Sequence, residues 1–175
     1  MSVVCCRVYE DRIEIASDSI TVRGWTQEKG RDNHSKLVAV NDMVIGSVGR
    51  AEDSSLMQLF CATHKPEGAS ESDILSFMVE FLDWKKKKTD QKQTSGVFIL
   101  LFEGKAFYIN GFFIKEVVSY EAIGAGMDFA LSALYLGHNV EKAVETACEL
   151  SVMCEKPIQS LKMDKAGKKK TARKK

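Results

Sequence analysis

The start of the chain can combine a nucleophile and a base in one residue. Ser2 follows Met1, and a strand-like segment begins directly after it. Removal of Met1 would leave Ser2 with a free α-amine, whose ordinary pKa is about 7.7 to 8.0. Such an amine can accept the proton of its own residue's hydroxyl at neutral pH. Ser2 is therefore a candidate N-terminal nucleophile.

Three further residues form a candidate constellation with Ser2. Asp18 lies in IEIASDS, Lys36 in HSKLVAVND and Gly49 in MVIGSVGRAED. All stand at or near the ends of segments with the pattern of strands. Taken singly, each has an ordinary structural explanation: a processed N-terminus, a turn, a charge at a strand edge and a helix-start residue. Their combination and order make the hypothesis of a catalytic site.

Hydrophobic patterns predict the elements that would position these residues. Apolar alternation and turn residues indicate strands over 3–8, 12–16, 36–40, 43–48, 96–102, 105–109, 112–119 and 157–161, with 19–22 as an extension and 24–35 as a loop. Helical periodicity indicates helices after Gly49 and over 70–88, 126–136 and 140–153. Strands and helices segregated in this order favour an α+β sandwich, with two central sheets covered by helices on both sides.

Two helices carry more specific signals. In the helix after Gly49, one apolar face is expected to contain Ala51, Leu56, Leu59 and Phe60. The next helix begins with Ser70 and Asp73 in the spacing of a capping box. Its lysines at 85–88 are interpreted as a solvated end that suits the helix dipole.

The ordered motifs resemble those of the N-terminal-nucleophile hydrolases of the proteasome β-subunit and bacterial HslV type. In that family a mature N-terminal Thr is the nucleophile, and Ser2 takes its place here. The spacing from Ser2 to Asp18 fits without a gap, KLVAVND and IGSVGRAED fit after a small insertion, and AIGAGMDFALSAL matches the family's Gly-rich turn into a helix. The resemblance implies a four-layer αββα sandwich, the proteasome-like Ntn-hydrolase fold, over residues 1–161.

The resemblance also implies a role for each site residue. Ser2 Oγ would attack a peptide carbonyl while its own amine accepts the proton, directly or through a water. The Lys36 cation would lower the pKa of hydroxyl and amine, and Asp18 would hold that cation in place. The backbone N–H of Gly49 would donate to the developing oxyanion. An acyl-enzyme ester would form and then be hydrolysed.

Two segments depart from the family pattern. Ala125 stands between Gly124 and Gly126, where the family usually has a Ser whose hydroxyl bonds near the N-terminal amine. The proteasomal D-x-x-S-G-G segment is replaced by SVMCEKP. This second segment is closer to HslV, whose turn can hold a monovalent cation on backbone carbonyls. By position, that cation would be bound by Ser151, Cys154 and Pro157.

Composition agrees with this interpretation. The 175 residues suit one domain, and 45% hydrophobic with 28% charged residues is typical of a globular protein. The start shows no secretory leader, no apolar run could span a membrane, and the five cysteines show no C-x-x-C spacing. A cytoplasmic location with reduced thiols is therefore expected, and a catalytic cysteine is the minor alternative.

The formal charge of +1 is unevenly divided. Residues 162–175 contain eight Lys or Arg and one Asp, a net charge of +7, so the remainder carries −6. This segment lacks apolar periodicity and is expected to be a disordered basic tail. It could attract nucleic acid or another anionic partner, or simply aid solubility.

Other catalytic classes have less support. Gly124-Ala125-Gly126 lacks the third glycine of a dinucleotide fingerprint, no Walker loop is present, and the three histidines show no metal-ligand spacing. No cofactor is therefore required.

The resemblance implies a self-compartmentalising peptidase of six-fold or seven-fold rings, which could stack. An ATP-dependent unfoldase would feed unfolded polypeptide into the chamber. The alternatives are a non-catalytic structural or binding subunit that retains Met1, and an amidase that uses the same nucleophile on a small amide.

Overall fold

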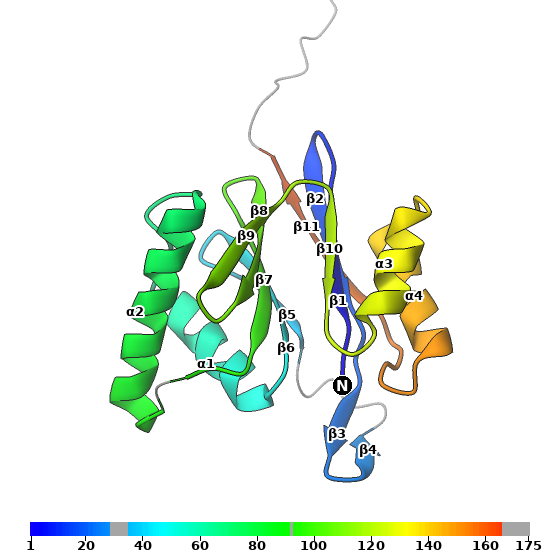
Figure 1. Ribbon diagram of the computed structural model, residues 1–175, viewed down its shortest axis with the longest axis horizontal. Helices are drawn as coiled ribbons and strands as arrows, with labels where there is room; N and C mark the ends of the chain where they lie inside the picture. Colours follow the sequence, from blue (N-terminus) through cyan, green and yellow to red (C-terminus); the bar gives the residue numbers. More distant parts are fainter. Residues whose placement is uncertain (29–34, 92, 166–175) are drawn as a thin grey trace, which may run out of the picture.

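Two stacked β-sheets, each covered by a pair of helices, form the centre of the molecule (Figure 1). The structure is a computed structural model that describes residues 1–28, 35–91 and 93–165. From one side to the other, its layers are two helices, a five-stranded sheet, a four-stranded sheet and two helices (Figure 1). The predicted four-layer αββα architecture is confirmed.

The four-stranded sheet carries the N-terminus. Its order is β10 (Tyr120–Ile123), β1 (Val4–Val8), β2 (Arg12–Ser17) and β11 (Gln159–Asp164), with every neighbouring pair antiparallel. Helices α3 (Met127–Tyr135) and α4 (Val140–Leu150) cover its outer face (Figure 1). The first strand is thus internal to the sheet, which fixes the start of the chain in the protein.

The five-stranded sheet is a meander of antiparallel strands. It contains β5 (Leu37–Val40), β6 (Met43–Val48), β7 (Val97–Phe102), β8 (Lys105–Asn110) and β9 (Phe113–Val117). Helices α1 (Ala51–Cys61) and α2 (Glu71–Thr89) cover its outer face (Figure 1). A separate hairpin, β3 (Thr21–Arg23) with β4 (Thr26–Glu28), projects beside the N-terminus (Figure 1).

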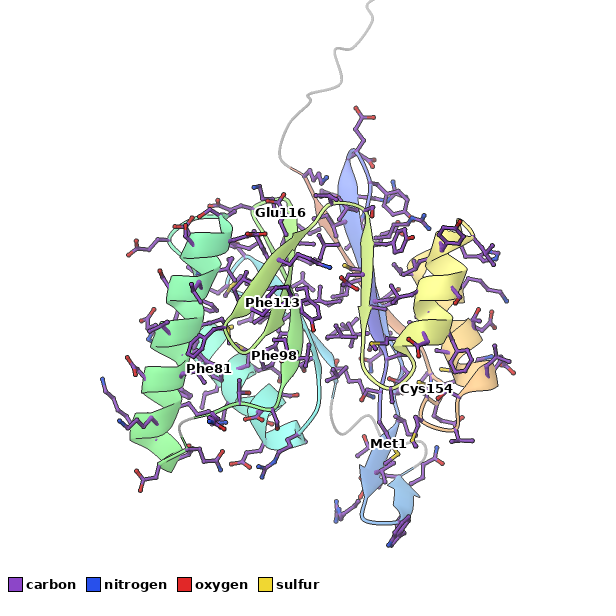
Figure 2. The ribbon with its side chains drawn as sticks, viewed as in Figure 1. Met1, Phe81, Phe98, Phe113, Glu116 and Cys154 are labelled. Atoms are coloured by element: carbon purple, nitrogen blue, oxygen red, sulfur yellow. The ribbon has the colours of Figure 1, made fainter. Side chains whose placement is uncertain are left out.

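Alternation along the strands divides the core into three apolar clusters. In β1, Cys5 packs against α3 and α4 while Val4 and Cys6 pack between the sheets, because successive strand side chains point to opposite faces. The third cluster joins α1 and α2 to the five-stranded sheet. Phe81 on α2 and Phe98 on β7 belong to it, and Figure 2 shows both between helix and sheet.

Local signals set several boundaries correctly. Asn41 and Asp42 have φ of 50° and 63°, so the β5–β6 hairpin turns through the two residues expected to tolerate this conformation. The predicted capping box is present at α2. Ser70 Oγ accepts from the Asp73 N–H at 3.2 Å, and Asp73 Oδ2 accepts from the Ser70 N–H at 3.0 Å.

Other expectations were wrong because tertiary pairing overrode local pattern. Residues 21–23 leave β2 to pair with 26–28, so the expected extension and part of the expected loop form the β3–β4 hairpin. The second helix of the C-terminal pair ends at Leu150 and not at 153. On α1, Phe60 is buried and Leu56 packs against the core as expected, but Ala51 and Leu59 are exposed. The buried face is completed by Asp53, Ser54, Met57 and Cys61.

The C-terminal strand continues into the segment assigned to the basic tail. Lys162, Met163 and Asp164 pair with Glu14, Ile13 and Arg12 of β2. Residues 166–175 lie outside the described part of the chain, so the tail itself stays a sequence-based prediction. Within the described residues, no helix combines the length and apolar character that crossing a membrane requires.

Candidate active site

Ser2 is held at the start of β1 by the turn that precedes α3. Its carbonyl oxygen accepts from the Gly126 N–H at 3.1 Å, and its hydroxyl donates to the carbonyl oxygen of Met1. Gly124 has a φ of +97°, and a Cβ there would lie 2.4 Å from the Ser2 carbonyl oxygen. Only glycine fits this contact, so the Gly-rich turn found in the sequence positions the candidate nucleophile.

Asp18 ties three segments together immediately after β2. Its carboxylate is fully buried and accepts backbone N–H groups from Val3 at 2.9 Å, Ile20 at 3.1 Å and Glu155 at 3.2 Å. The Asp18 N–H in turn donates to the Val3 carbonyl at 3.2 Å. Asp18 thus anchors the residue next to Ser2, the approach to β3 and the loop after α4.

Lys36 crosses from the other sheet to reach Asp18. Its Nζ lies 3.3 Å from Asp18 Oδ1 and donates to the carbonyls of Asp18 at 3.1 Å and Ile20 at 2.8 Å. Burial lowers the pKa of Lys36 from its ordinary value, and the negative charge of Asp18 opposes this effect. The three oxygen atoms around Nζ favour its charged form, so the pair supplies a fixed cation beside Ser2.

Gly49 directly follows β6 and has a φ of +109°, a conformation that residues with side chains rarely adopt. It lines a pocket of about 170 Å³ together with Ser2 and Lys36. The remaining walls come from Met1, the segment after β2, β3, the end of β6 and the start of α1: Met1, Ile20, Thr21, Val22, Ser47, Val48, Ala51 and Ser54. Three of the four predicted site residues therefore line one pocket, and Asp18 supports Lys36.

A larger hollow elsewhere does not bear on this chemistry. It measures about 470 Å³ and lies between β2, β11 and the start of α4, with Glu14, Asn139 and Glu141 among its lining residues. None of the four predicted site residues lines it. The smaller pocket is the better site candidate because it collects a hydroxyl, a buried cation and a glycine turn.

Solved structures with the same architecture were found across almost the whole chain. BPH from Thiobacillus denitrificans, in complex with epoxomicin, matches with a TM-score of 0.83 at 21% sequence identity, covering 94% of this chain and 100% of that one. A second BPH structure matches with a TM-score of 0.82 at 21% identity, covering 93% and 97%. Eukaryotic HslV from Trypanosoma brucei matches with a TM-score of 0.69 at 19% identity, covering 93% and 99%.

This chain has an HslV-like fold. The fold expected from the ordered sequence motifs is thereby confirmed. No protein-family model and no curated protein matches the sequence.

Within the HslV-like fold, sequence reasoning missed most of the pocket wall. Thr21 and Val22 reach the pocket from the separate β3 strand, and Ser54 reaches it from α1. The sequence pattern indicates residues 19–22 only as a strand extension, and Ser54 carries no signal beyond its nearness to Gly49. These residues become recognisable only when the two sheets are stacked.

The cysteines near the site are protonated thiols. Burial, and then the negative charge of Asp18, raises the pKa of Cys148 to about 12 and that of Cys154 to about 11. The pKa values of Cys5, Cys6 and Cys61 are also raised by burial. A thiol acts as a nucleophile through its thiolate, so the catalytic-cysteine alternative loses support. All five cysteines are free.

The predicted cation segment adjoins the site. Figure 2 shows Cys154 at the same end of the molecule as Met1. The Ser151 carbonyl accepts from the Cys154 N–H at 3.2 Å, and the Pro157 carbonyl accepts from the Ser19 hydroxyl at 2.5 Å. A carbonyl oxygen has two lone pairs, so these contacts leave acceptor capacity for a cation. The cation site stays a prediction.

Ala125 is exposed on the turn that holds Ser2. It brings no hydroxyl to the start of β1, so any proton transfer at the Ser2 amine would depend on other groups or on water. The HslV-like fold thus retains the glycine contacts of this turn while lacking the hydroxyl noted in the sequence.

Proposed function

We propose that this chain is a peptidase subunit in which Ser2, after removal of Met1, is the nucleophile. The observation that carries the proposal is the pocket lined by Ser2, Lys36 and Gly49, with the buried Asp18–Lys36 pair beside it. The pocket contains the hydroxyl of Ser2, which would become the N-terminal residue, and the Lys36 cation, which would lower the pKa of that hydroxyl. The Gly49 turn offers a backbone N–H to an oxyanion. The fold shared with BPH and HslV supports this assignment.

In the proposed reaction, Ser2 Oγ attacks the carbonyl carbon of a peptide bond. Its proton passes to the Ser2 amine, directly or through a water, and then to the leaving amine. The Lys36 cation stabilises the developing negative charge on Oγ, and the Gly49 N–H donates to the oxyanion. Collapse leaves an ester on Ser2, which water hydrolyses to regenerate the enzyme.

The substrate is proposed to be unfolded polypeptide. A pocket of about 170 Å³ accommodates a side chain and its backbone but not a folded surface. A self-assembled ring, six-fold or seven-fold, would enclose such sites, and an ATP-dependent unfoldase would supply the chain. This part of the proposal rests on the family resemblance.

The deciding experiment is an intact mass of the purified protein before and after epoxomicin, the compound bound in the BPH structure. Epoxomicin is a peptide epoxyketone, so its two electrophilic carbons can react with the hydroxyl and amine of one N-terminal residue. We expect loss of Met1 and one adduct per chain.

Two variants make this experiment specific. Ser2→Ala should lose the adduct, whereas Ser55→Ala, which removes an exposed hydroxyl on α1 outside the pocket, should keep it. An adduct that persists in Ser2→Ala would refute the assignment of the nucleophile. A processed wild-type chain that forms no adduct and cleaves no peptide would refute peptidase function.

A second candidate function is a non-catalytic structural or binding subunit. Ala125 favours it, because the turn against Ser2 lacks the hydroxyl that the family usually places there. This candidate predicts retained Met1, no epoxomicin adduct and no ring formation. A ring with a processed N-terminus would oppose it.

A further inference from the structure

A buried ion pair lies outside the site residues described above. Lys85 on α2 and Asp53 on α1 form a salt bridge, and their exposed fractions are 0% and 2%. The sequence had placed Lys85 in a solvated helix end, which is wrong: Lys86, Lys87 and Lys88 are exposed, but Lys85 points into the protein. A charge buried in this way requires an explanation.

The ion pair is completed by the segment that leads into β7. Lys85 Nζ donates to the Gln93 carbonyl at 2.8 Å. Asp53 Oδ2 accepts from both the N–H and the hydroxyl of Ser95, each at 3.0 Å. Burial alone would raise the pKa of Asp53, but the hydrogen bonds from Lys85 and Ser95 hold it below its ordinary value. Two helices and one loop are thus joined through a single carboxylate.

This network extends by direct backbone contact to Gly49. A Cβ built on Gly49 would lie 2.8 Å from the Ser95 carbonyl oxygen and 3.2 Å from Gly96 Cα. The strand register continues the contact, because Val48 pairs with Val97. Gly96 is itself confined, since a Cβ there would lie 2.6 Å from Phe98 Cζ and 3.2 Å from Asp53 Cβ. The position of the Gly49 turn therefore depends on where Asp53 holds Ser95.

Stability alone gives a weak reason for such a pair. Desolvation of two charges offsets most of their attraction, and well-packed apolar residues often stabilise a fold as much or more. The Asp53 carboxylate, however, fixes the position of the loop at Ser95 through two hydrogen bonds, which an apolar side chain cannot form. The ion pair is better explained by the geometry it imposes.

We propose that Lys85, Asp53 and Ser95 are positioning residues that fix the Gly49 backbone N–H as the oxyanion donor. The proposal rests on the peptidase function proposed above. Lys85 neutralises the buried carboxylate and orients it, Asp53 holds the Ser95 backbone, and Ser95 with Gly96 supports the Gly49 turn from behind. None of the three lines the substrate pocket.

The first test uses the oxyanion as its readout. For Lys85→Met we expect kcat on a peptide amide to fall about 10-fold to 100-fold with KM unchanged, because a displaced oxyanion donor weakens the transition state and not the bound substrate. Affinity for a peptide boronate, which forms a tetrahedral adduct on Ser2 Oγ, should fall by a similar factor. Equal losses in kcat and boronate affinity are the signature of positioning.

Matched variants separate positioning from stability. Met78→Ala removes a fully buried side chain from the same helix without touching Ser95, so it should destabilise the fold and leave kcat unchanged. The double variant Lys85→Met/Asp53→Leu leaves no unpaired buried charge and should recover stability but not kcat. If Lys85→Met folds poorly, Ser95→Ala supplies the test, because it removes one hydrogen bond at an exposed residue and should lower kcat by a smaller factor.

A second readout does not require activity. Hydrogen exchange followed by mass spectrometry should show faster exchange in peptides covering 47–51 for Lys85→Met and Ser95→Ala, but not for Met78→Ala. Unchanged exchange there, or kcat losses that track stability across all variants, would overturn the proposal. If the wild type neither cleaves peptides nor labels, the peptidase function fails, and the exchange data still decide whether the ion pair holds the Gly49 turn.

Discussion

Substitution of Gly124 by Ala tests how tightly the start of the chain is held. Gly124 and Gly137 both have positive φ, +97° and +92°. A Cβ at Gly124 would lie 2.4 Å from the Ser2 carbonyl oxygen, whereas a Cβ at Gly137 would meet no atom within 4 Å. Gly137→Ala therefore introduces the same backbone strain without the contact, and the difference between the two variants isolates the contact with Ser2.

The expected magnitudes follow from this comparison. A side chain in this backbone region costs roughly 1 to 2 kcal/mol at either position. Overpacking against a fixed backbone atom adds about 2 kcal/mol at Gly124, within the usual range of 1 to 3. For a domain of this size, Gly124→Ala should lower the Tm by about 4 to 8 °C more than Gly137→Ala. Its Ser2 carbonyl must also move away from the Gly126 N–H.

Thermal unfolding by circular dichroism measures the stability difference, and the rate of epoxomicin labelling measures the position of Ser2. We expect Gly124→Ala to lose both stability and labelling, and Gly137→Ala to lose only a little stability. Equal Tm values for the two variants, or full labelling of Gly124→Ala, would refute the argument that this turn positions the nucleophile.

Four further predictions address the other parts of the structure. Lys36→Met should abolish labelling and cost about 2 to 4 kcal/mol, at the low end of the loss expected for a broken buried ion pair, because Asp18 keeps three backbone donors. The pKa of Lys36 is lower in the folded protein than in the unfolded chain, so at alkaline pH the unfolded chain binds more protons than the folded one. Stability from this group therefore rises with pH. Urea titrations should show the wild type gaining stability relative to Lys36→Met as the pH rises toward 10.5. Ser70→Ala should cost about 1 kcal/mol in the same titration through loss of the α2 cap, with no effect on labelling. Replacing K⁺ and Na⁺ by choline should slow labelling if carbonyls of 151–157 bind a monovalent cation, and an unchanged rate would exclude that role.

Most strands of the two sheets were predictable because their information is local, but β10 was not among the expected strands. Apolar alternation in β2 and the Asn41-Asp42 turn each specify a conformation through a few neighbouring residues. The β3–β4 hairpin was missed for the opposite reason. Its strands have three residues each, and what separates them from β2 is pairing with each other beside the pocket.

The candidate site was predictable to the extent that its residues lie at the ends of strands. Ser2, Asp18, Lys36 and Gly49 each follow or precede an apolar run, and stacking the two sheets brings those ends together. Their contacts were not predictable. That Asp18 accepts from Glu155, 137 residues away, depends on the path of the chain after α4.

Lys85 shows most clearly where local reasoning reaches its limit. It begins a run of four lysines near a helix end, and such a run is ordinarily solvated. Its burial depends on Asp53, 32 residues earlier, which stands in the first turn of α1 where an acidic residue is also ordinary. Taken alone, each residue has an ordinary explanation as a charged residue on the surface of a helix, so neither one predicts that the other is its partner. Only the packing of α1 against α2 brings the two charges together, and the same packing places the Ser95 backbone against Gly49. A residue can therefore affect the proposed oxyanion donor without any catalytic motif to mark it.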